Sequence, residues 1–245
     1  MPAFKMTLCY DGTRYRGWQK QGNTPDTLQE KLECTLSRLL SQPIEINGCG
    51  RTDAGVHARM QVCSFRAETD MKCSELMAAL NRYLPEDIGC IDLQPVPPRF
   101  HARLSCREKT YVYRVWTGKQ PDVFERKYRF TFTEPLDTDK MASAAAYLTG
   151  THDYRAFTTA AHMKKSTVRT VSEIRIEKEG NELRFIYTGN GFLYNMVRIL
   201  TGTLLEVGTG KREPEEMPLI LESENRSAAG FTAPPHGLFL WNIVY

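Results

Sequence analysis

The chain has 245 residues, of which 41% are hydrophobic and 25% are charged, and its formal net charge is +3. These values are ordinary for a globular protein that buries a core in one large or two small domains. No apolar run approaches the length of a membrane span and the N-terminus lacks a signal-peptide core, so we expect no membrane partner and a cytoplasmic location. The seven cysteines are scattered without a Cys-x-x-Cys pair. That pattern predicts reduced thiols rather than a zinc site or a disulfide framework.

The first half of the chain predicts the order strand, helix, strand, strand, helix, strand. Apolar alternation indicates a strand over residues 3–11, and we expect further strands over residues 44–52, 60–67 and 88–96. Leucines at helical spacing indicate a helix that starts at Thr24-Pro25 and runs to Ser41, and a second helix over residues 74–84. Residues 12–23, between the first strand and the first helix, contain three glycines and predict a mobile loop.

The same kind of order returns in the second half. We expect a strand over 109–117, a helix over 137–148 capped by Asp137 or Thr138, and a hairpin of 167–177 with 182–189 around the turn Glu179-Gly180-Asn181. Helices over 195–207 and 214–222 and a last strand over 237–245 follow. The repeat predicts an α+β fold of two ferredoxin-like or RRM-like halves that share a central, mainly antiparallel sheet with helices on one side. The Pro-rich residues 95–98 are the natural hinge, which gives domains of residues 1–103 and 104–245.

The segment with the most chemical content is residues 50–58, Gly-Arg-Thr-Asp-Ala-Gly-Val-His-Ala. An extended chain would place Arg51 and Asp53 on one face, where a charge and its counter-charge could share a pocket. Glycines on both sides let the backbone turn sharply or approach a ligand closely. The alternative is a turn aspartate that bonds nearby backbone N–H groups. His57 by itself indicates a structural or substrate-positioning role more than a general base.

Two more segments combine glycines with arginines. Residues 10–19 hold Arg14, Arg16 and Gln19 among exposed-looking aromatics in an expected loop, which suits contact with a polyanion, or else forms an ordinary connection. Residues 189–198 end in Arg198, a charge within an otherwise apolar helix. A buried arginine needs a carboxylate and Asp53 is a candidate, whereas the alternative is an arginine that reaches the surface.

Basic residues also alternate with aromatics between residues 99 and 116. This stretch has five Lys or Arg against one acid, which suits phosphate contacts and base stacking, although a solvated strand face would look the same. A second basic cluster is Lys164-Lys165 with Arg169.

Several common motifs are absent. Gly210-Lys211 lacks the first glycine and the Ser or Thr of a phosphate-binding loop, and Gly48-x-Gly50 lacks the third glycine of a dinucleotide fingerprint. There is no His-Glu-x-x-His motif and no Gly-x-Ser-x-Gly elbow. The sequence therefore predicts neither a metal centre nor a nucleotide cofactor.

Taken together, these segments resemble the tRNA pseudouridine synthase A family. The resemblance covers nearly the whole chain: residues 10–19, 50–58, 100–103 with 109–113, 150–157, 191–198, and 232–234 through 237–238. It implies the pseudouridine synthase fold, a homodimer without a cofactor, and isomerisation of uridines 38, 39 and 40 in the anticodon stem-loop of tRNA. The target nucleotide would be flipped out of its stack.

The resemblance also implies roles for individual residues. Asp53 is the catalytic aspartate, Arg51 helps to extrude the nucleotide, Tyr111 stacks on the target uracil, and Arg198 pairs with Asp53 and keeps it ionised. Tyr111 is also a substrate-binding candidate, and the remaining ones are Arg14, Arg16, Gln19, His57, Arg103, Arg107, Lys109 and Lys164.

The chain departs from the family pattern at three positions, where Tyr154, Asn195 and Leu104 stand in place of commoner residues. Two other functions remain open on the residues alone. One is a non-catalytic RNA chaperone of the same shape, which needs the basic clusters but not Asp53. The other is a metal-dependent hydrolase that uses Asp53 and His57.

Overall fold

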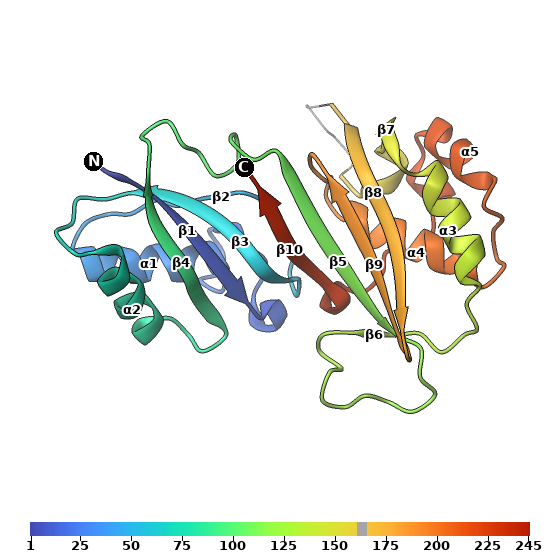
Figure 1. Ribbon diagram of the computed structural model, residues 1–245, viewed down its shortest axis with the longest axis horizontal. Coiled ribbons are helices and arrows are strands. Elements are labelled where there is room, and N and C mark those ends of the chain that lie inside the picture. Colours follow the sequence, from blue (N-terminus) through green and yellow to red (C-terminus); the bar gives the residue numbers. More distant parts are fainter. Residues whose placement is uncertain (161–165) are drawn as a thin grey trace. The chain divides into compact units, whose positions relative to one another are not determined.

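The computed structural model describes residues 1–160 and 166–245 (Figure 1). The chain divides into two compact units: residues 1–107 with 239–245 form unit 1, and residues 108–238 form unit 2. Each unit combines helices with a mostly antiparallel sheet, which confirms the predicted α+β class. The division falls after Arg107, and the last strand of the chain belongs to unit 1.

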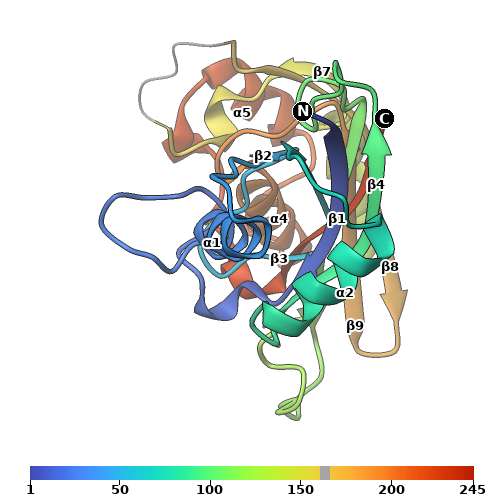
Figure 2. The same ribbon diagram turned by 90° about the vertical axis from the view of Figure 1, so that its left-hand side faces the viewer.

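The sheet of unit 1 has the strand order β4-β1-β3-β10. β1 is antiparallel to both β3 and β4, and β10 runs parallel to β3. In β1 every second side chain, from Phe4 to Tyr10, is buried, so one face of the strand builds the core. Helix α2 packs on β4 and α1 packs on α2, and Figure 2 shows α1 to one side of the sheet. The elements are β1 (Ala3–Tyr10), α1 (Leu28–Leu40), β2 (Asn47–Gly48), β3 (His57–Arg66), α2 (Cys73–Tyr83), β4 (Ile88–Val96) and β10 (Leu238–Val244).

Helix α1 begins at Leu28, three residues after the expected Thr24-Pro25 start. Thr27 is the N-cap, and its side chain accepts the backbone N–H of Glu30 at 3.3 Å. Thr24 instead bonds the N–H of Asp26 within its own turn, at 3.1 Å. Both threonines offer the same cap chemistry, and the local turn at Thr24 decides between them.

The predicted strand over residues 44–52 is wrong, because only Asn47–Gly48 pairs, with β3. The backbone N–H groups before it bond to side chains of α1: Ile44 donates to Ser37 Oγ at 2.9 Å and Ile46 donates to Glu33 Oε1 at 3.0 Å. Ile44 and Ile46 are buried all the same, so an apolar alternation like that of a strand packs here without a ladder.

The sheet of unit 2 has the strand order β5-β9-β8-β7, with all three pairs antiparallel, and β6 runs parallel to β5. Helices α3 and α4 contact each other, and they contact β8 and β5 respectively, so they share one face of the sheet. Asp137 caps α3 and Gly180 turns the β8–β9 hairpin at φ +58°, as predicted. The elements are β5 (Glu108–Trp116), β6 (Phe130–Thr131), α3 (Thr138–Tyr147), β7 (Gly150–Asp153), β8 (Val168–Glu179), β9 (Glu182–Gly189), α4 (Met196–Gly208) and α5 (Glu216–Ser223).

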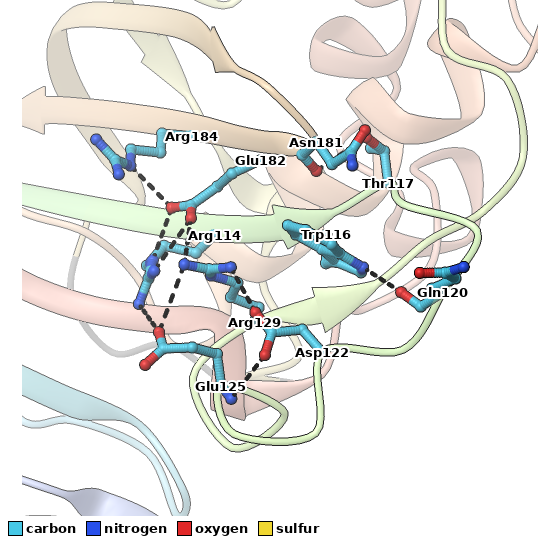
Figure 3. A network of polar contacts seen from close by, with 10 residues as sticks. All are labelled: Arg114, Trp116, Thr117, Gln120, Asp122, Glu125, Arg129, Asn181, Glu182 and Arg184. Atoms are coloured by element: carbon cyan, nitrogen blue, oxygen red, sulfur yellow. Dashed lines mark hydrogen bonds and ion pairs between the residues drawn. The ribbon is translucent and has the colours of Figure 1, made fainter.

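A network of ion pairs ties β5 and β9 to the loop before β6 (Figure 3). At its centre is Glu182, whose side chain is 6% exposed. It accepts hydrogen bonds from Arg114 Nε and Arg184 Nε, both at 2.8 Å, and forms an ion pair with Arg129 Nη2 at 2.8 Å. Burial alone would raise the pKa of Glu182, but the hydrogen bonds and charges of these arginines outweigh it and lower the pKa to about 2.

We expect Glu182→Gln to lower the free energy of unfolding by about 3 kcal/mol at neutral pH, because it leaves half-buried arginines without their counter-charge. Since the pKa is lowered on folding from 4.5 to about 2, the contribution of the ionised carboxylate is complete above pH 4.5 and is lost as the pH falls toward 2. Urea denaturation from pH 6 to pH 3 should therefore show a shallower acid loss in the variant than in wild type. Glu179→Gln is the control, because Glu179 also pairs with Arg184 but is 76% exposed. A Glu182→Gln variant with wild-type stability and pH slope would contradict this account.

Candidate functional site

Asp53 lies on the irregular segment between β2 and β3. Arg51 is exposed, Thr52 is buried and Asp53 is half-buried, so burial alternates along these three residues. A turn follows in which the N–H of Val56 bonds the main-chain carbonyl of Asp53 at 3.2 Å, and Gly55 adopts φ +78°. Main-chain bonds therefore close this turn.

Residues 10–18 clamp the segment that carries Asp53. The N–H of Trp18 donates to the carbonyl of Thr52 at 3.0 Å, and the N–H of Gly55 donates to the carbonyl of Tyr15 at 3.3 Å. The hydroxyls of Tyr10 and Thr52 share a hydrogen bond of 2.8 Å. Hydrogen bonds of Thr52 and Gly55 thus hold the backbone on both sides of Asp53.

Two glycines make this approach sterically feasible. A Cβ at Gly12 would overlap the carbonyl oxygen of Val56, and a Cβ at Gly17 would lie 2.9 Å from the carbonyl oxygen of Thr52. Gly17 also has φ +97°, where other residues are strained. Tyr15 and Trp18 are 5% and 2% exposed, so the expectation of exposed aromatics in this segment is wrong. The glycines of residues 10–18 permit the close approach to the segment that carries Asp53, and the aromatic residues of this stretch are buried.

His57 begins β3 and has no exposed surface. Its Nδ1 accepts the N–H of Gly12 at 3.0 Å, and its ring stacks on Phe239 with the centroids 4.7 Å apart. Asp11 Oδ1 lies 3.1 Å from the same nitrogen. The ring lies in the interior and positions Gly12, and this position does not support the expected direct contact of His57 with RNA.

The other expected contact residues of unit 1 differ in their surroundings. Arg14 is exposed but paired with Asp87, Nη2 to Oδ2 at 2.7 Å. Gln19 is half-buried and donates from Nε2 to Gln29 Oε1 at 2.7 Å. The remaining three, Arg16, Arg103 and Arg107, are exposed. Lys164 lies outside the described residues.

Tyr111 lies in the middle of β5 in unit 2, opposite Tyr187 of β9. Its side chain is largely buried, and its ring meets the edge of Phe192 with centroids 5.2 Å apart. An edge-to-face neighbour fixes the plane of an aromatic ring. Lys109, two residues earlier on the same strand, is half-buried opposite Gly189.

Arg198 stands in the first turn of α4 and is half-buried. Its Nε donates to the carbonyl of Ala233 at 2.7 Å and its Nη1 donates to Asn195 Oδ1 at 2.8 Å. Asn195 adopts φ +61° just before the helix, and its Nδ2 donates to Thr159 Oγ1 at 2.7 Å. The guanidinium is therefore held by two oxygens of its own unit.

Asn195 and Ala233 are positioning residues that sequence analysis missed. Asn195 was noted only as a departure from the family pattern, and the signal available was its place three residues before Arg198. The positive charge of Arg198 also acts on its neighbours. Burial raises the pKa of Tyr113 and lowers that of His236; the charge of Arg198 opposes the first shift and adds to the second.

The other two departures have separate explanations. Tyr154 has no exposed surface, and its hydroxyl donates to the carbonyl of Leu148 at 2.8 Å, so the interior accommodates the extra oxygen. Leu104 is 79% exposed.

In the part of the chain that the structure describes, no group of three or more His, Cys, Asp or Glu is arranged to hold a metal ion. A metal-dependent hydrolase would need such a group around Asp53 and His57. Across residues 1–160 and 166–245, no helix has both the length and the apolar character to span a membrane.

Comparison with known proteins assigns the class. The sequence model of a family described as tRNA pseudouridine synthase matches residues 7–104 and 144–245, which defines an isomerase that acts on tRNA. The chain is 43% identical to tRNA pseudouridine synthase A of Bacillus sp. (strain KSM-64) and 41% identical to tRNA pseudouridine synthase A of Clostridium acetobutylicum, each over 100% of both chains. A third relative, tRNA pseudouridine synthase A 2 of Bacillus cereus (strain ZK / E33L), is 40% identical over the same coverage. The chain belongs to the tRNA pseudouridine synthase A family.

Among solved structures, the chain resembles one in a Cbf5-Nop10-Gar1 complex and one in the archaeal box H/ACA sRNP Nop10-Cbf5 complex. The TM-scores are 0.37 and 0.36, both at 14% identity. The matches cover 82% and 83% of this chain but 45% and 44% of the others. Likenesses this remote add nothing to the family assignment.

The clamp on Asp53 predicts that Gly17→Ala lowers activity on tRNA at least tenfold and stability by about 1–3 kcal/mol, because a side chain at φ +97° is strained and meets Thr52. Gly22→Ala is the matched control in the same connection, since a Cβ there has nothing within 4 Å. Initial rates and thermal melting of both variants check this. Wild-type activity in a folded Gly17→Ala protein would show that the clamp is dispensable.

Proposed function

We propose that this protein converts uridine to pseudouridine at positions 38, 39 and 40 in the anticodon stem-loop of tRNA, with Asp53 as the essential carboxylate. Membership of the family supports isomerisation of uridine in tRNA. The observation that carries the role of Asp53 is its position: it is half-buried, two residues after the exposed Arg51, on a segment whose backbone is hydrogen-bonded to residues 15–18.

The reaction needs an ionised carboxylate and no redox partner. The bond between uracil N1 and ribose C1′ breaks, a bond between C5 and C1′ forms, C5 loses a proton and N1 gains one. Asp53 would act by attack on C1′, by addition to the uracil ring, or by removal of a ribose proton, and each role uses the same carboxylate beside the same nucleotide.

The target base has to leave its stack before it can react, which costs a few kcal/mol. In this proposal Arg51, exposed next to Asp53, occupies the vacated space, and Tyr111, whose ring Phe192 holds edge-on, stacks on the extruded uracil. Arg198 pairs with Asp53 and keeps it ionised. The protein acts as a homodimer in which both subunits bind one tRNA. Cations such as Arg16, Arg103 and Arg107 contact the tRNA phosphates.

The direct test uses an anticodon-arm transcript with tritium at C5 of uracil. Asp53→Asn should release tritium at least about 1000-fold more slowly than wild type, because the amide can neither attack nor accept a proton. Asp70→Asn, an exposed aspartate of the same unit, should match wild type. Release by Asp53→Asn within tenfold of wild type would refute the proposal. A variant without activity that still restored every cellular phenotype would favour an RNA chaperone instead.

Arg198 should serve the chemical step more than binding. We expect Arg198→Ala to lower kcat at least about 100-fold while the tRNA Kd changes less than threefold, since its proposed partner is the carboxylate and not the RNA backbone. Arg107→Gln should behave in the opposite way, raising Kd and lowering the salt slope of binding by about 1. Single-turnover kinetics and filter binding separate the two. Equal loss of kcat and affinity in Arg198→Ala would exclude this role.

A further inference from the structure

The loop between β5 and β6, residues 117–129, carries an exposed apolar tip. Phe124 is 89% exposed and Val123 is 52% exposed. Single exposed apolar residues are common on protein surfaces, so exposure alone does not indicate a partner. What distinguishes this loop is how it is held.

The ion-pair network fixes the loop on both sides of the tip (Figure 3). Before the tip, the indole N–H of Trp116 donates to the carbonyl of Gln120 at 2.8 Å, and Asp122 pairs with Arg129 at 2.8 Å. After the tip, Glu125 Oε2 lies 3.1 Å from Arg114 Nη1 and 3.6 Å from Arg129 Nη2. A loop fixed in this way presents its tip with little loss of conformational entropy on binding.

The same network sorts the charges of the loop. Its two acids, Asp122 and Glu125, are turned toward the arginines at its base. Lys119 and Arg126 are exposed, and among the residues that the structure describes neither has an ion-pair partner. Arg126 donates to the carbonyl of Val123, so its guanidinium lies against the tip. The loop thus combines an exposed ring with two exposed cations, Lys119 and Arg126, whose charges its acids do not pair with.

This combination fits a ligand that is both aromatic and anionic. Proteins bind unpaired nucleotides by stacking bases on aromatic rings and by meeting phosphates with Lys and Arg. An apolar protein surface would pack against Phe124 but would gain nothing from Lys119 and Arg126.

We propose that the tip of the β5–β6 loop is a tRNA-binding element, in which Phe124 stacks on an unpaired base while Lys119 and Arg126 contact the adjoining phosphates. The proposal rests on tRNA being the substrate. It adds a contact outside residues 50–58 and Arg198, and it assigns a role to a loop that the family's sequence model, which matches residues 7–104 and 144–245, does not cover.

The test measures binding rather than turnover. The probe is a full-length tRNA transcript whose target uridines are replaced by cytidine, so that no reaction occurs. Phe124→Ala should raise its Kd about tenfold, the loss expected for one stacked base, whereas Phe124→Tyr should stay within twofold of wild type. Thermal melting should be unchanged, because the ring is 89% exposed.

The cations are tested separately through salt. The double variant Lys119→Gln with Arg126→Gln should lower the slope of log Kd against log salt by about 2. Lys178→Gln, an exposed lysine of β8, is the control and should leave the slope unchanged.

An unchanged Kd in Phe124→Ala would overturn the proposal. So would a changed sedimentation coefficient of the RNA-free variant, because the tip would then contact a second copy of the chain. Wild-type protein that bound the probe but released no tritium from the uridine substrate would refute the proposed function and leave this element standing, so the two failures are distinguishable.

Discussion

The close backbone contact between residues 10–18 and the segment of Asp53 is the constraint on which the candidate site of unit 1 depends. Two main-chain hydrogen bonds, Trp18 to Thr52 and Gly55 to Tyr15, join residues 15–18 to residues 52–55, and neither stretch belongs to a strand. The contact requires Gly12 and Gly17, because a Cβ at either position would meet backbone of the other stretch. The same contact accounts for the burial of Trp18, although its sequence neighbours Arg16 and Lys20 are exposed.

In unit 2, too, charged side chains are held by hydrogen bonds and ion pairs to specific partners. Arg198 is oriented by the carbonyl of Ala233 and the amide of Asn195. Glu182 binds Arg114, Arg129 and Arg184, and through Arg114 and Arg129 it stabilises the β5–β6 loop, which is distant in sequence. In both cases a buried or half-buried charge is tolerated because its hydrogen-bonding groups are used.

What the sequence predicts correctly is local. The bounds of β4, the Asp137 cap of α3 and the Gly180 turn of the β8–β9 hairpin each depend on a few adjacent residues, and all are confirmed. The features that the sequence does not predict depend on residues far apart in the chain. The amides of Ile44 and Ile46 bond to side chains of α1. The parallel pairing of β10 with β3 joins the end of the chain to unit 1, which no local pattern reports. Asp53 could be chosen as a candidate from its motif, whereas the contact of Asn195 with Arg198 required the position of its Oδ1.

The central claim is that the clamped carboxylate of Asp53 isomerises uridine in the anticodon arm. Mapping pseudouridine at single-nucleotide resolution in bulk tRNA tests it most directly, in cells without this gene that are supplied with wild type or with Asp53→Asn. The account predicts pseudouridine at positions 38, 39 and 40 with wild type, and unmodified uridine there with Asp53→Asn or without the gene. Modification restored by Asp53→Asn, or identical maps in all three, would contradict it.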